Sequence, residues 1–232
     1  MKTSLRILNR NTLKYIAIIA MLLDHVAEGF LPQLSWQYQL MRFIGRLTGP
    51  VMAFFIAEGF IHTHDRDRYG KRLAIFALIS WVPYSLFRYD GWPSISQSVI
   101  FTLLLGYVAI YIWDREDISK SGKIVTTAAL CGLSILGDWG VSDVLWPVFF
   151  FIYKDKPVQK WLSYYIAAAL YIWPAFFDFR GSMYNLGLLF VPIILIFLYN
   201  GEGGRKKAIH KWFFYVFYPL HLLVLFIFKK LI

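Results

Sequence analysis

The sequence predicts an all-α integral-membrane protein, a polytopic helix bundle with about nine transmembrane segments and a range of eight to ten. Composition is the first reason: 58% of the 232 residues are hydrophobic and only 16% are charged, whereas soluble domains carry about 25% charged residues. The second reason is the alternation of apolar runs with short basic connections. No separate soluble domain is visible, so we expect residues 1–232 to form a single domain.

Nine apolar runs are each expected to form a helix. They fall at about residues 12–31, 40–62, 72–88, 98–113, 123–138, 142–153, 161–177, 184–199 and 211–229. A full span needs about 20 apolar residues, and several of these runs are shorter. The sixth run also holds Pro147, so we expect a half-helix or a re-entrant segment there. The first run lacks a cleavage-site pattern and is interpreted as a retained helix, not a signal peptide.

The charges of the connections predict the orientation. Basic residues gather before the first run and in every second connection: Lys2, Arg6, Arg10, Lys14; Arg66, Arg68, Lys71, Arg72; Arg115, Lys120, Lys123; Lys154, Lys156, Lys160; Arg205, Lys206, Lys207, Lys211. The positive-inside rule then places the N-terminus on the cytoplasmic side of the membrane and, with nine spans, the C-terminus outside. We expect this membrane to be a bacterial inner membrane. The net charge of +10 is explained by these connections, so we expect no nucleic-acid partner.

The first helix carries the most informative polar residues. Lys14 stands at its entrance and His25 deep inside it, about 16 Å apart at a helical rise of 1.5 Å per residue. Ionisable residues at that depth are costly and are functional candidates, which applies to Asp24, His25 and Glu28. A carboxylate of Asp24 or Glu28 bonded to the imidazole would fix its tautomer and raise its basicity. The alternative is a purely structural histidine.

Two further helices offer partners for His25. Arg42 and Arg46 lie one turn apart on the second run, and they either balance Asp24 and Glu28 as ion pairs or hold a substrate carbonyl and stabilise an oxyanion. On the last run, Tyr218 and His221 are expected at a depth comparable to that of His25.

A second group of polar residues is expected near the cytoplasmic face. Glu58 and His62 lie one turn apart at the inner end of the second run, and the next helix begins near Tyr69, Lys71 and Arg72. Cations near a helix start favour a diphosphate; the alternative is that they only mark the cytoplasmic side. His62 and His64 diverge at a spacing of two, and Cys131 is the only cysteine, so no metal is expected.

The chain resembles the TraX family in several blocks. They include Met21-Leu22-Leu23-Asp24-His25 with Leu13-Lys14, and Tyr218-Pro219-Leu220-His221-Leu222 in the last helix; the others fall at residues 45–50, 54–63, 69–77 and 79–84. The named member of this family is associated with N-terminal acetylation of conjugative pilin. The family in turn resembles the membrane acyltransferase-three superfamily, in which a basic residue, ten intervening residues and a histidine mark the first helix. Lys14 and His25 fit that spacing.

The resemblance implies an acyltransferase-like membrane domain that uses cytoplasmic acetyl-CoA. His25 is then the catalytic base or a transient acyl carrier, helped by Asp24, Glu28 and Arg46. The donor would lie among Lys14, Glu58, His62, Tyr69, Lys71 and Arg72, and the acceptor near Arg42, Tyr218 and His221. The expected acceptor is an amine or hydroxyl on an exported peptide or a glycan, and the bilayer and further copies of the chain are its other expected partners.

Two other functions stay open at this stage. In a proton-coupled transporter, the buried residues Asp24, His25, Glu28, Arg46 and Glu58 would form a proton relay. In a noncatalytic assembly protein for envelope fibres, the same residues would serve packing alone.

Overall fold

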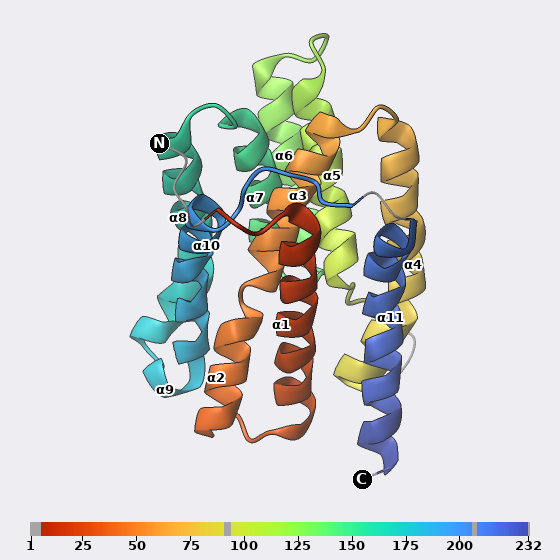
Figure 1. Cartoon of the computed structure of the whole chain (residues 1–232), viewed down its shortest axis with the longest axis vertical. Helices are drawn as coiled ribbons and strands as arrows, with labels where there is room; N and C mark the ends of the chain where they lie inside the picture. The colour runs from red at the N-terminus through yellow and green to blue at the C-terminus, as the bar shows by residue number, and fades with distance from the viewer. Residues whose placement is uncertain (1–5, 91–93, 206–207, 232) are drawn as a thin grey trace. The chain divides into compact units, whose positions relative to one another are not determined.

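The computed structural model describes residues 6–90, 94–205 and 208–231, and all of its regular secondary structure is helical (Figure 1). Lys2, Lys206 and Lys207 lie outside the described residues, as does the side chain of Lys211. The all-α prediction is confirmed. The elements are α1 (Arg10–Phe30), α2 (Trp36–Gly45), α3 (Thr48–His62), α4 (Arg66–Tyr89), α5 (Val99–Asp114), α6 (Lys120–Ser134), α7 (Gly140–Ile152), α8 (Pro157–Ile172), η1 (Trp173–Phe176), α9 (Phe179–Ser182), η2 (Met183–Phe190), α10 (Val191–Phe197) and α11 (Ala208–Leu231).

Three stretches are long and apolar enough to cross a membrane, namely Trp36–His62, Phe179–Phe197 and Trp212–Leu231. The chain is therefore a helical membrane protein, while the number of nine spans stays a prediction. α1 is not among the three, because every 18-residue stretch of it holds three charged residues. α7 has 13 residues with Pro147 inside, or about 20 Å of helix, which is shorter than the hydrocarbon layer of about 30 Å.

Three predicted runs are divided in the structure. The second run is α2 followed by α3, with a break at residues 46–47. Pro50 lies in the first turn of α3 and has no N–H to offer the carbonyl of Arg46, which accounts for the break. The seventh run is α8 followed by η1, and the eighth is η2 followed by α10.

The chain forms two compact units. We call residues 1–52 with 169–232 the terminal unit, and residues 53–168 the central unit. Each is described by itself below. The expectation of one functional domain over residues 1–232 stays a prediction.

In the terminal unit, α1 packs between α2 and α11 (Figure 1). At one end, the chain before α1 pairs with the connection after α10: Leu8 N donates to Leu198 O at 2.9 Å and Asn200 N to Leu8 O at 3.0 Å. At the other end, the Tyr184 backbone N–H donates to Gln39 Oε1 at 3.1 Å. The predicted basic connections thus share one end of this unit.

In the central unit, α5 packs closely against α7. A Cβ built on Gly106 would lie 2.6 Å from the Asp143 carbonyl oxygen, so only glycine allows this approach. As in the terminal unit, alternate connections lie at the same end of this unit. Arg66 forms an ion pair with Asp114 at one end, and Gln97 N donates to Leu136 O at 2.7 Å at the other. This arrangement agrees with alternating connections, while the orientation in the membrane stays a prediction.

Candidate functional site

The polar residues of α1 point in two directions. Lys14 and His25 are eleven residues, or about three turns, apart and therefore share a face, and this face meets α11. Asp24 is one residue earlier and so lies about 100° around the helix, where it meets α2. Neighbouring residues of α1 thus belong to two different contacts.

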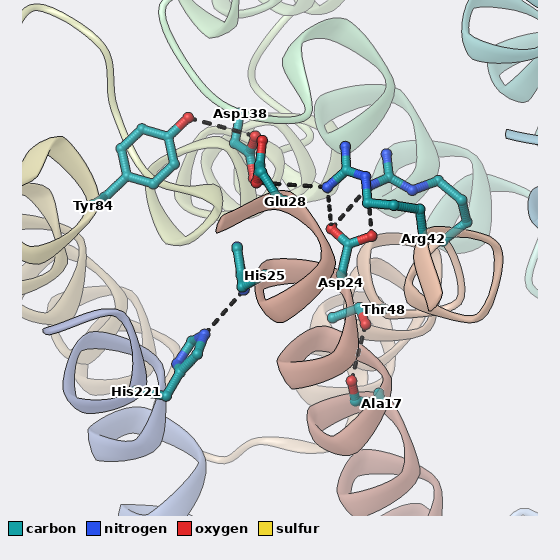
Figure 2. A network of polar contacts seen from close by, with 10 residues as sticks. Ala17, Asp24, His25, Glu28, Arg42, Thr48, Tyr84, Asp138 and His221 are labelled. Carbon is teal, nitrogen blue, oxygen red and sulfur yellow. Dashed lines mark hydrogen bonds and ion pairs between the residues drawn. The ribbon is translucent and has the colours of Figure 1, made fainter. Parts of the chain in front are cut away.

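The first contact is a pair of buried imidazoles (Figure 2). His25 Nδ1 lies 3.0 Å from His221 Nε2, and the two residues are 5% and 6% exposed. His221 Nδ1 lies 2.9 Å from the Phe217 carbonyl oxygen, one turn earlier on α11. The buried ring of Tyr218 packs edge-on against both imidazoles, with centroid distances of 6.3 and 5.5 Å. α1 and α11 therefore bring His25, Tyr218 and His221 together.

The second contact is a buried ion-pair cluster between α1 and α2. Arg42 Nη1 donates to Asp24 Oδ2 at 2.7 Å, and Arg46 Nη2 donates to both oxygens of Asp24 at 3.0 and 2.9 Å. Glu28 lies 3.5 Å from Arg42 Nη1. Two acids and two guanidiniums make the cluster neutral, which lowers the cost of burying each charge.

Two packing features hold this cluster in place. A Cβ built on Gly45 would lie 2.2 Å from Asp24 Oδ1, so a glycine is needed where α2 crosses the carboxylate. The ring of Tyr184, from η2, lies 4.9 Å from the Arg42 guanidinium and 5.2 Å from that of Arg46. Such cation–π contacts stabilise a desolvated guanidinium.

These contacts bear on the predicted roles. Arg42 and Arg46 form the ion pairs that one of the two predicted roles requires. His25 lies against His221, whereas Asp24 is bound by the two arginines on another face of α1. Orientation of the imidazole by a carboxylate, and oxyanion stabilisation by Arg46, stay predictions.

Lys14 lies on the same face as His25, nearer the start of α1. Its ammonium is 5.4 Å from the ring centroid of Phe214 on α11. Next to it, the Tyr15 hydroxyl lies 2.8 Å from His210 Nδ1. α1 and α11 therefore make polar and aromatic contacts both at the level of Lys14 and at the level of His25.

The other residues predicted to bind the donor belong to the central unit. Glu58 and His62 line a pocket of about 330 Å³ together with Phe54, Ala57, Ile61, Phe150, Lys154, Asp155 and Lys160. Tyr69 packs on Tyr107 with a centroid distance of 5.0 Å, and the Arg72 guanidinium lies 5.6 Å from the Tyr69 ring. Lys71 is exposed. Lys14 belongs to the terminal unit, so this predicted group is divided between the units.

Sequence reasoning missed several of these residues. Tyr184 gave no signal, because it is separated from Arg42 by more than 140 positions and looks like one aromatic among many. Lys154 and Lys160 were interpreted only as topology markers, yet they line the pocket of Glu58 and His62. Asp143 was not singled out from the sequence, but it is fully buried in α7 and bonded to Thr102 of α5.

The fold and the site define a class: a helical membrane protein with a buried histidine pair and a compensated ion cluster on two different faces of its first helix. The chain belongs to the TraX family, since the family model described as TraX protein matches residues 9–229. The predicted resemblance is thereby confirmed.

Two other proteins are similar to this chain over most of its length. The chain is 33% identical over 228 residues, covering 92% of both chains, to the "Probable fimbrial assembly protein FimC, serogroup H1" of Dichelobacter nodosus. It is 25% identical over 220 residues, 88% of this chain and 84% of the other, to the "Uncharacterized protein RP591" of Rickettsia prowazekii (strain Madrid E). No solved structure matches.

Proposed function

We propose that the protein is a membrane-embedded acetyltransferase that moves an acetyl group from cytoplasmic acetyl-CoA to an amine or hydroxyl acceptor. The observation that carries this proposal is the contact between His25 and His221, 3.0 Å between ring nitrogens of two buried side chains. Placing two imidazoles in contact inside a bundle is costly for packing alone, because each brings polar nitrogens that must be satisfied. A reacting imidazole, by contrast, needs such a partner.

The position of Lys14 supports the same proposal. A cation at the predicted cytoplasmic end of α1 suits the phosphates of CoA. His25 lies about 16 Å further along the same face, a distance comparable to the reach of a pantetheine arm. The thioester of a donor held at Lys14 would then arrive near His25.

His25 has two possible tasks in the transfer. As a general base it would take the proton of the acceptor amine or hydroxyl while that group attacks the thioester. As a nucleophile it would carry the acetyl group for a moment before passing it on. Both routes use one unprotonated ring nitrogen of His25, and an acceptor displayed on the outer face would receive the group across the membrane.

The second candidate is a noncatalytic role in assembling envelope fibres. The specific observation in its favour is the name of the Dichelobacter nodosus relative, a probable fimbrial assembly protein. The two candidates differ in what His25 does. In the assembly role, His25→Ala leaves fibre assembly intact; in the acetyltransferase, it abolishes transfer.

Ligand stabilisation tests the donor site. Saturating acetyl-CoA at 100 times its dissociation constant adds about 2.7 kcal/mol to the stability of the purified protein. We expect a clear shift in the unfolding temperature for wild type and His25→Ala and a smaller one for Lys14→Ala. Lys120→Ala, at an exposed lysine of another basic connection, is the matched control and should behave as wild type. An unshifted, well-folded wild-type sample at millimolar acetyl-CoA would count against the proposal.

Radiolabelled acetyl-CoA tests the transfer itself. Added to inside-out membrane vesicles, it should label an envelope component in wild type but not in His25→Ala. Equal labelling by both proteins would contradict a catalytic His25. Normal fibres in cells that carry only His25→Ala would favour the assembly role.

A further inference from the structure

The hydrogen bonds of the histidine pair fix where its protons lie. His221 Nδ1 faces the carbonyl oxygen of Phe217 at 2.9 Å, and a carbonyl only accepts, so Nδ1 of His221 carries a proton. In a neutral imidazole the other nitrogen is then an acceptor. His221 Nε2 is thus the acceptor, and His25 Nδ1, 3.0 Å away, is the donor.

The proton on His25 therefore lies on Nδ1, and its Nε2 is left with a lone pair. The opposite arrangement would turn a bare Nδ1 of His221 towards the Phe217 oxygen, two acceptors facing each other in a buried site. The neutral pair has one consistent proton order.

We propose that His221 is a proton-holding partner of His25: it accepts the hydrogen bond from Nδ1 at rest and receives that proton when Nε2 of His25 takes one from the acceptor. This inference rests on the proposed function. A backbone carbonyl could hold the hydrogen bond from His25 but could not take the proton. An imidazole can do both, which gives His221 a task that the backbone does not perform.

Every proton in the proposed transfer step has a donor and an acceptor. The attacking amine or hydroxyl gives its proton to His25 Nε2, and the Nδ1 proton of His25 moves to His221 Nε2. His25 is then neutral again, and His221 is an imidazolium that still donates from Nδ1 to the Phe217 carbonyl. As the carbon–sulfur bond breaks, the shift reverses, and His25 Nε2 delivers the proton to the thiolate of CoA.

The surroundings of the pair suit this role. Asp24, the nearest carboxylate in sequence, is bound by Arg42 and Arg46 on the α2 side of α1. The Tyr218 ring packs against both imidazoles. The positive charge formed during transfer passes from His25 to His221, and His221 acts as a positioning residue through His25.

Nitrogen NMR tests the proton order without any need for activity. In protein with ¹⁵N-labelled histidine in lipid nanodiscs, we expect His25 to be protonated at Nδ1 and bare at Nε2. We also expect a scalar coupling across the hydrogen bond between His25 Nδ1 and His221 Nε2. The exposed His64 serves as an internal reference outside the pair. A proton on His25 Nε2, or no coupling in a folded sample, would overturn the inference even if transfer is active.

Two variants separate holding the hydrogen bond from taking the proton. His221→Gln keeps an acceptor for His25 Nδ1–H but cannot become a cation, whereas His221→Leu offers neither. We expect both variants to lower acetyl labelling in vesicles by about 10²-fold, the lower range of general acid–base effects, while His221→Gln keeps the tautomer of His25. His64→Gln should label as wild type. Near-normal labelling by His221→Gln would overturn the proton-taking role, and wild type without labelling but with the coupling would reject the enzyme and keep the proton order.

Discussion

The two units each bury an aspartate, and they treat it in opposite ways. Asp24 in the terminal unit is 8% exposed and receives hydrogen bonds from two guanidiniums. Asp143 in the central unit is 0% exposed, and its single polar contact among the described residues is the Thr102 hydroxyl at 2.8 Å. An uncompensated buried carboxylate is very costly. The terminal unit therefore holds a charged acid, and the central unit is expected to hold a neutral one.

The contacts of Thr102 support a neutral Asp143. Its hydroxyl lies 2.9 Å from the Val99 carbonyl oxygen and 2.8 Å from Asp143 Oδ2. A hydroxyl has one proton, and when it donates to the Val99 carbonyl, the contact with Oδ2 is satisfied only if Asp143 donates. The comparison teaches that charge is kept beside the histidine pair, where the arginines offset it, and is removed in the core of the central unit.

Removing the charge of Asp24 should have the largest effect on stability. Asp24→Asn leaves two guanidiniums buried with only Glu28 to offset them, and breaking a buried ion pair costs about 3–5 kcal/mol. Thermal unfolding in detergent measures this loss, with Asp117→Asn in the exposed connection after α5 as the matched control. If the two variants unfold at the same temperature, the ion cluster contributes nothing to stability.

Crowding the same carboxylate should have the next largest effect. In Gly45→Ala the new Cβ would lie 2.2 Å from Asp24 Oδ1 and 2.4 Å from its Cβ, so α2 must move away from α1. Overpacking of this kind costs about 1–3 kcal/mol. Gly132→Ala in α6 is the control, because nothing lies within 4 Å of its Cβ and an alanine there should stabilise the helix by about 0.5–1 kcal/mol. A Gly45→Ala protein as stable as wild type would show that the helices do not meet at Gly45.

Neutralising Asp143 should cost much less than neutralising Asp24. Asp143→Asn is close in shape to the neutral acid, and we expect a loss of at most about 1 kcal/mol, the value of one ordinary hydrogen bond. Unfolding temperatures of Asp143→Asn and Asp24→Asn, measured side by side, make the comparison direct. A loss at Asp143 as large as that at Asp24 would mean that both acids are charged.

The sequence predicts which residues share a helix face in the terminal unit, but it does not predict the contacts between helices that form the site. The spacing of Lys14 and His25 places them on one face of α1, and the spacing of Arg42 and Arg46 suits an ion-pair cluster. Periodicity does not say which helix each face meets. His25 and His221 are 196 positions apart, and only tertiary packing brings them together. Asp143 was missed because a single acid in a short apolar run looks like part of a connection until α5 covers it.

The smallest effect on stability is expected for an exposed carboxylate, such as that of Asp117 between α5 and α6. Hydrogen bonds from Arg115, at 2.7 and 2.6 Å, lower the pKa of Asp117. A carboxyl group with a lowered pKa stabilises the fold at pH values above its ordinary value of about 3.9. This stabilisation is lost as the pH falls through the lowered pKa. Because both side chains are exposed, solvent screens the pair. Wild type and Asp117→Asn should therefore unfold at the same temperature from pH 7 down to pH 5, within the scatter of the measurement. A clear gap between them over that range would show that an exposed pair in a connection stabilises this membrane protein as a buried one does.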